Sequence, residues 1–166
     1  FSLLGKSWPC SLKLAQEVFI SRESPKDSSS SKAYDNRDLL PGALSFLKKL
    51  QQVNIKCAII SNDTSNGIEG FLTRNNIEQY ITTYWSADFL PTKPNPEAVK
   101  GLCQKIKLDP SQCALIGDAD SDLNMAKDAG IPLVLGYTSG WSVPPQLKAH
   151  HHLIHHWDDL TVGTNP

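Results

Sequence analysis

Residues 113–122 read CALIGDADSD, and this stretch decides the class of fold. Its first four residues form a short apolar run, which is typical of a strand buried on both faces of a parallel sheet. An acidic loop follows, and then an amphipathic helix over about residues 121–129 that stops at Gly130, the residue type that best tolerates a left-handed helix end. A second apolar strand is expected at 131–135. This order of strand, helix and strand predicts a parallel sheet with right-handed crossovers.

The same alternation recurs from residue 39 onward. We expect helices at 40–50, 66–75 and 95–106, and strands at 56–60, 81–84 and 152–156. The fold class is therefore α/β, a Rossmann-like parallel sheet flanked by helices, in one core domain over residues 39–166. Residues 1–38 differ, because a helical pattern at 12–20 runs into a proline and four consecutive serines, which predict a flexible linker.

Composition excludes several classes of function. The chain has 166 residues, with 16 Lys and Arg against 17 Asp and Glu, so no strong net charge favours nucleic acid or an anionic membrane as a partner. No apolar run is long enough to span a bilayer. The four cysteines form no CxxC pair and no zinc-ligand spacing, so we expect reduced thiols in a cytoplasmic protein.

Three carboxylates crowd the loop after the 113–116 strand: Asp118, Asp120 and Asp122. Like charges this close repel one another unless a cation or a proton intervenes, and oxygen ligands at a strand end suit Mg²⁺. A calcium loop is excluded, because Leu123 stands where that loop needs Gly and Ala129 where it needs Glu. The structural alternative is a solvated helix start capped by Ser121 or Asp120.

Two further loops carry candidate ligands for a phosphoryl group. Ser61 and Asn62 lie between a strand and a helix, where a hydroxyl and exposed N–H groups form a phosphate cradle. Lys93 lies among three prolines at 91–96, which hold its ammonium as a point charge. The ordinary alternatives are a helix cap for the first pair and a solvated loop lysine for the second.

Taken in order, these motifs resemble those of the haloacid dehalogenase superfamily of phosphohydrolases. The matching pieces are Ile59-Ile60-Ser61-Asn62, Lys93-Pro94-Asn95-Pro96 and Gly117-Asp118-Ala119-Asp120-Ser121-Asp122, the family's second, third and fourth motifs. The resemblance covers roughly residues 39–160, and within the superfamily it is to the phosphoglycolate-phosphatase-like group.

The resemblance implies a Mg²⁺-dependent phosphatase that hydrolyses a small phosphorylated metabolite through an aspartyl-phosphate intermediate. Ser61 would bind the transferring phosphoryl oxygen, aided by backbone N–H near Asn62, and Lys93 would neutralise phosphoryl charge. Asp118 would bind Mg²⁺ directly, and Asp122 directly or through water.

The family's first motif, Asp-x-Asp after an N-terminal strand, is missing before residue 39. We expect the chain to be the C-terminal part of a longer phosphatase, residues 1–38 holding the remnant of a helical cap and its linker, with the nucleophile upstream. The chain alone should then be inactive. A sheet without its central strand could pair with another chain.

The alternative is a complete chain that has lost its nucleophile and binds phosphate or Mg²⁺ without turnover. A plain structural or interaction module is a third hypothesis.

The histidine-rich run at 150–156 also invites a metal interpretation. In a strand its side chains would alternate between the two faces. We therefore predict a surface strand end, with adventitious metal binding as the alternative.

Overall fold

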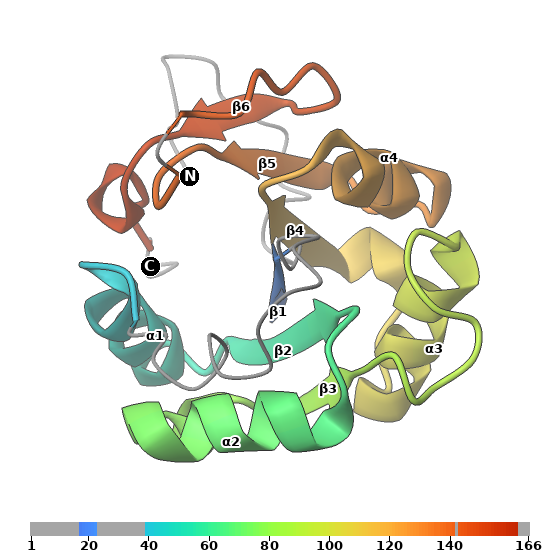
Figure 1. The fold of residues 1–166 in the computed structure, drawn as a ribbon, viewed down its shortest axis with the longest axis horizontal. Helices are drawn as coiled ribbons and strands as arrows, with labels where there is room; N and C mark the ends of the chain where they lie inside the picture. Colours follow the sequence, from blue (N-terminus) through green and yellow to red (C-terminus); the bar gives the residue numbers. More distant parts are fainter. Residues whose placement is uncertain (1–16, 23–38, 142, 163–166) are drawn as a thin grey trace, which may run out of the picture.

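The computed structural model describes residues 17–22, 39–141 and 143–162, which form one six-stranded parallel sheet flanked by helices (Figure 1). The strands are β1 (Glu17–Arg22), β2 (Lys56–Ser61), β3 (Thr83–Trp85), β4 (Cys113–Gly117), β5 (Leu133–Tyr137) and β6 (His152–Ile154). The helices are α1 (Ala43–Gln52), α2 (Ser65–Asn75), α3 (Pro96–Ile106) and α4 (Asp120–Asp128), with 3-10 turns η3 (Glu78–Tyr80), η4 (Pro110–Gln112) and η5 (Trp157–Asp159). The strand order is β3-β2-β1-β4-β5-β6 and every neighbouring pair is parallel, so the predicted α/β class is confirmed.

The sheet separates two hydrophobic cores. In β4, Ala114 and Ile116 belong to the core that α1 and α2 cover, whereas Cys113 and Leu115 belong to the core that α3 and α4 cover. Figure 1 shows the two pairs of helices on opposite sides of the sheet. Both faces are thus buried, which explains why the strands are continuous apolar runs.

The predicted helix ends of α3 and α4 are confirmed. The Asn95 side chain caps α3 by accepting a hydrogen bond from the backbone N–H of Glu97 at 2.9 Å, and Pro96 occupies the first turn. Gly130, just after α4, has a φ of +92°. Here the sequence signals were strong because each cap is a local interaction that needs no tertiary partner.

The prediction for the N-terminal region is wrong where the structure describes it. Glu17–Arg22 form strand β1, not part of a helix over 12–20, and β1 lies in the centre of the sheet between β2 and β4. The expected sheet without a central strand is therefore also wrong. Helical and strand periodicity are hard to distinguish over so few apolar residues, and an extended segment here pairs the backbone groups of two neighbouring strands. The cap remnant and linker predicted within 1–16 and 23–38 lie outside the described residues.

Several boundaries and one helix cap also differ from prediction; the helix expected at 40–50, for example, covers Ala43–Gln52. β5 begins at Leu133 instead of 131, because Pro132 has no N–H to donate to a ladder. β3 begins at Thr83 instead of 81, since η3 precedes it. Helix α4 has Ala119 at its N-cap and no side-chain cap, so the alternative that Ser121 or Asp120 caps it is wrong.

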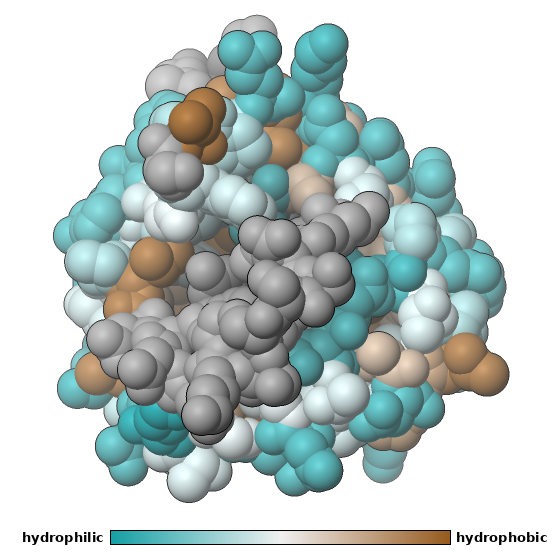
Figure 2. All heavy atoms as spheres, viewed as in Figure 1, coloured by the Kyte–Doolittle hydropathy of each residue, from teal (hydrophilic) through white to brown (hydrophobic). Residues whose placement is uncertain are grey.

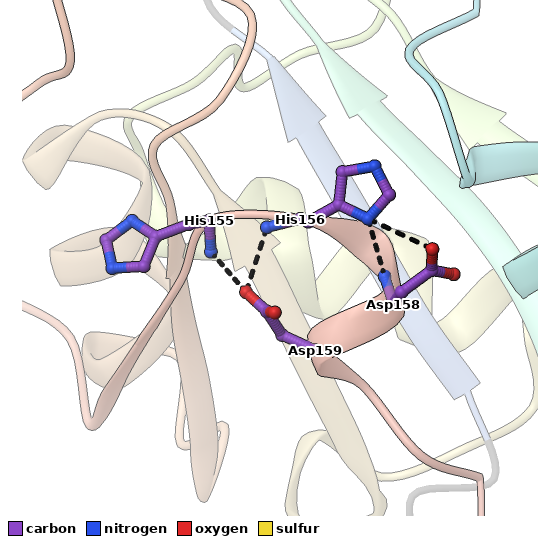
Figure 3. Close-up of polar contacts among 4 residues, drawn as sticks. All are labelled: His155, His156, Asp158 and Asp159. Carbon is purple, nitrogen blue, oxygen red and sulfur yellow. Dashed lines mark hydrogen bonds and ion pairs between the residues drawn. The ribbon is translucent and has the colours of Figure 1, made fainter.

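The histidine-rich run ends in a local hydrogen-bonded turn (Figure 3). Asp159 Oδ2 accepts the backbone N–H groups of His155 and His156, at 2.7 and 2.9 Å, and His156 Nδ1 accepts the backbone N–H of Asp158 at 3.1 Å. Edge strand β6 covers His152–Ile154, within the predicted range. Among the described residues, no group of three or more His, Cys, Asp or Glu side chains is arranged to hold a metal ion.

On the face drawn in Figure 2, the described residues form no large apolar patch. The face shown in Figure 2 is mostly hydrophilic, with its hydrophobic residues in separate spots. The large hydrophobic side chains that are exposed in the described part of the chain are Leu44, Leu90, Trp141, Val143 and Leu153. None of the described helices is both long and apolar enough to cross a bilayer.

Candidate functional site

The candidate residues lie where the parallel strands end. Ser61 is the last residue of β2, and Asp118 directly follows β4. β1 runs between these strands, with Arg22 in register with Ser61 and Ile20 with Ile116. Two strand spacings put the ends of β2 and β4 about 10 Å apart. Ligands of open α/β sheets bind at this edge.

Lys93 and Asp122 form a buried ion pair at this edge. Lys93 Nζ lies 2.8 Å from Asp122 Oδ1, and each side chain is only 1% exposed. Lys93 is therefore not the solvated loop lysine of the alternative prediction. Neither carboxylate oxygen of Asp122 has a hydrogen-bond partner among the described residues, so the nearby ammonium is what compensates its buried charge.

Asp118 has a different environment. The residue is 7% exposed, and its Oδ2 accepts a hydrogen bond from Trp141 Nε1 at 3.2 Å. Sequence reasoning missed Trp141, because the four tryptophans are scattered and no motif surrounds this one.

Asp120, the middle carboxylate of the acidic loop, anchors the backbone. Its Oδ1 accepts the N–H groups of Ala149 and Lys148, each at 2.8 Å. The hydrogen bond from Ala149, with a further contribution from that of Lys148, keeps the pKa of Asp120 below its ordinary value even though burial opposes the shift. The three carboxylates therefore differ in their partners: Asp118 accepts from an indole N–H, Asp122 pairs with a lysine and Asp120 holds a loop.

Ser61, the last residue of β2, does not cap the helix that follows it. Ser61 Oγ accepts the backbone N–H of Asp63 at 3.1 Å, while the N-cap of α2 is Thr64, whose side chain accepts the N–H of Gly67. The alternative that Ser61 and Asn62 cap this helix is therefore wrong. Asn62 is exposed.

The loop that follows β3 is hydrogen-bonded to the start of α2. Asp88, after β3, accepts the backbone N–H of Ser65 at 2.8 Å, and the hydroxyls of Ser65 and fully buried Ser86 are 2.8 Å apart. The hydrogen bond from the Ser65 N–H lowers the pKa of the Asp88 carboxyl. These contacts tie the start of α2 to the loop that follows β3. No sequence pattern marked them, because the partners are more than 20 residues apart.

The donor set is compatible with Mg²⁺. Asp118 offers a carboxylate at the strand end, and Asp122 offers Oδ2, which has no hydrogen-bond partner among the described residues, while its Oδ1 pairs with Lys93. Mg²⁺ keeps several waters and uses one or two protein carboxylates together with substrate phosphate, so it does not need a cluster of three such side chains.

Comparison with known proteins agrees with this geometry. A family model described as haloacid dehalogenase-like hydrolase matches residues 14–135. The chain belongs to this family. In sequence it is 31% identical over 106 residues to a phosphoglycolate phosphatase of Vibrio vulnificus, a match that covers 61% of the chain and 46% of the relative. It is 26% identical over 153 residues to a phosphoglycolate phosphatase of Photobacterium profundum, covering 89% of the chain and 66% of the relative.

Solved structures of this family share the fold. A predicted phosphoglycolate phosphatase from Haemophilus somnus superposes with a TM-score of 0.65 at 25% identity, covering 77% of this chain and 59% of that one. A HAD-superfamily hydrolase from Ehrlichia chaffeensis gives a TM-score of 0.64 at 25% identity, covering 89% and 61%. The chain spans about half the length of the first curated relatives it matches.

Proposed function

We propose that this chain carries the phosphoryl-binding part of a Mg²⁺-dependent phosphatase that acts on a small phosphorylated metabolite. The observation that carries the proposal is the buried Lys93–Asp122 ion pair at the carboxyl edge of the sheet, next to the loop that presents Asp118. In a haloacid dehalogenase-like hydrolase with phosphoglycolate phosphatases among its relatives, a fixed ammonium at this place can bind the phosphoryl group of a substrate.

Each residue has a role that follows from its surroundings. Lys93, held by Asp122, neutralises charge on the phosphoryl oxygens, and its burial strengthens this interaction. Ser61 donates its hydroxyl hydrogen to a phosphoryl oxygen while its own oxygen still accepts the Asp63 N–H, and the backbone N–H of Asn62 extends this cradle. Asp118 would bind the metal directly, and Asp122, which also holds Lys93, would bind it directly or through water. A bound Mg²⁺ supplies Lewis-acid stabilisation of the charge on the transferring group.

We place the aspartate nucleophile of such a phosphatase upstream of these 166 residues, and it would then reach the site from a segment other than the central strand, because β1 already fills that position. β1 ends at Ser21 and Arg22, so neither of the last two residues of this central strand is a carboxylate. The chain alone therefore binds the phosphoryl group without forming an aspartyl-phosphate.

The second candidate is a binding protein of the same family that has no nucleophile. It is favoured by one observation: Glu17–Arg22 already fill the centre of the sheet. The two candidates differ in whether the natural protein is heavier than 18.3 kDa and contains an Asp-x-Asp strand upstream. Intact-mass spectrometry of the protein from its source distinguishes them. In either case we place the protein in the cytoplasm, where buried cysteines such as Cys57, Cys103 and Cys113 serve as small hydrophobic residues.

Calorimetric titration of the 166-residue chain with inorganic phosphate, with and without MgCl₂, tests the proposal. We expect phosphate binding that weakens about tenfold or more in Lys93→Met, because a charge-assisted contact is lost. Lys49→Met, which changes an exposed lysine on α1, is the matched control and should bind as the unchanged chain does. Phosphate binding that is absent, or equal in both variants, would contradict the proposal. Clear Mg²⁺-dependent hydrolysis of a phosphomonoester by the chain alone, abolished by Asp118→Asn, would overturn the assignment of the nucleophile upstream.

A further inference from the structure

Trp141 is the large aromatic side chain in contact with the candidate site. Its indole N–H donates to Asp118 Oδ2 at 3.2 Å, while 40% of the residue remains exposed. An indole has one polar hydrogen and a broad apolar ring, so with its N–H engaged the rest of the ring can offer only apolar surface to a ligand. None of the family motifs quoted above includes Trp141.

The loop that carries Trp141 is held at two positions just before the tryptophan. Thr138 is buried, and its backbone N–H donates to the carbonyl of Ile154 at 3.1 Å. Gly140 has a φ of +84°, and a Cβ built on it would lie 2.9 Å from Leu40 Cδ1. The backbone just before Trp141 thus passes against Leu40 in a conformation that favours glycine. The ring is held beside Asp118 by this packing as well as by its own hydrogen bond.

An exposed tryptophan beside a phosphoryl site meets the part of the substrate that is not phosphate. Tryptophan is enriched where proteins bind ligands, because it supplies a large rigid apolar surface with few rotatable bonds. A group that packs on the ring gains roughly two- to tenfold in affinity. The phosphate itself gains nothing from this face, since it is bound by the lysine and the hydroxyl.

We propose that Trp141 is a specificity-determining residue, whose ring receives the organic group of a phosphomonoester while Asp118 holds its indole in place. The substrate class is a phosphomonoester whose organic group has an apolar or planar face. This inference rests on the proposed phosphoryl site.

The test compares inorganic phosphate with phenyl phosphate, titrated calorimetrically into the 166-residue chain in the presence of MgCl₂. We expect phenyl phosphate to bind roughly two- to tenfold more tightly than phosphate. Trp141→Ala should remove this preference, so that phenyl phosphate and inorganic phosphate bind within about twofold of each other, whereas Trp141→Phe should retain part of it. Val143→Ala, two residues further along the same loop and 77% exposed, is the control and should change neither affinity.

A second readout is spectroscopic and independent of affinity. The fluorescence difference between the unchanged chain and Trp141→Phe isolates the emission of Trp141 from that of the other tryptophans. Phenyl phosphate should change this difference spectrum, because its ring contacts the indole.

The outcomes separate the two proposals. If both ligands bind but Trp141→Ala keeps the preference for phenyl phosphate, the role of Trp141 is wrong and the phosphoryl site stands. If the unchanged chain shows no preference, the inference is overturned in the same way. If neither ligand binds, the phosphoryl site fails and the inference fails with it.

Discussion

The buried pair of Lys93 and Asp122 makes a quantitative prediction about stability. In Lys93→Met the side chain keeps nearly its length but loses its charge, so Asp122 remains in a site with 1% side-chain exposure and without the ammonium that lay 2.8 Å away. An uncompensated buried charge costs about 3–5 kcal/mol of folding free energy. For a chain of this size, that loss lowers the melting temperature by roughly 6–20 °C.

Urea denaturation at neutral pH, followed by circular dichroism, measures the free energy of unfolding by linear extrapolation. Asp122→Leu alone should also be strongly destabilising, because it leaves the ammonium buried. The double variant Lys93→Met/Asp122→Leu should recover most of the stability, since a well-packed apolar pair replaces a buried ion pair at little net cost. The double-mutant cycle should therefore give a coupling free energy of at least about 2 kcal/mol.

Lys49→Met is again the matched control, and we expect it to stay within about 0.5 kcal/mol of the unchanged chain, as is usual for surface positions. The reasoning is refuted if Lys93→Met costs less than about 1 kcal/mol. It is also refuted if the two single changes simply add in the double variant, because the pair would then not be coupled.

Three further predictions use other described contacts. Gly101→Ala should destabilise the fold by about 1–3 kcal/mol, since the added Cβ would clash with the Trp85 ring. Gly70→Ala should stabilise the fold by about 0.5–1 kcal/mol, because a Cβ there meets no atom within 4 Å and glycine is unfavourable inside a helix. Thermal melts compare the two variants. Asp120 has a lowered pKa in the folded state, so the stability that its carboxylate contributes is fully present above the unfolded pKa and is lost as the pH falls through the folded pKa. In Asp120→Asn, the free energy of unfolding measured by urea denaturation should therefore fall less steeply as the pH is lowered through the acid range. Ser61→Ala should weaken phosphate binding in calorimetry while costing only about 0.5–1.5 kcal/mol of stability, because one partly buried hydrogen bond is lost.

Each of these has an outcome that would contradict it. Equal effects of the two glycine changes would mean that α3 shifts freely away from Trp85. An unchanged acid limb in Asp120→Asn would remove the linkage assigned to its backbone hydrogen bonds. Undiminished phosphate binding in Ser61→Ala would place the phosphoryl group elsewhere.

The sequence alone determined the α/β class and most of the helices and strands after residue 39, and it suggested the candidate site residues other than Trp141. These features depend on local periodicity, on caps such as Asn95 and on short motifs at strand ends, all of which are visible within a few positions along the chain. For the same reason the family resemblance was carried by the three motifs and was later confirmed by the family model.

Only the tertiary structure decided how those residues divide their work. Asp118, Asp120 and Asp122 are equivalent by spacing, yet their partners are an indole, two backbone N–H groups and an ammonium, supplied by Trp141, by residues 148–149 and by Lys93. The strand at 17–22 was likewise decided by its neighbours, since the open backbone groups of β2 and β4 favour an extended segment between them. Partners far apart in sequence leave no periodic signal, so burial and pairing at these positions could be known only from the fold.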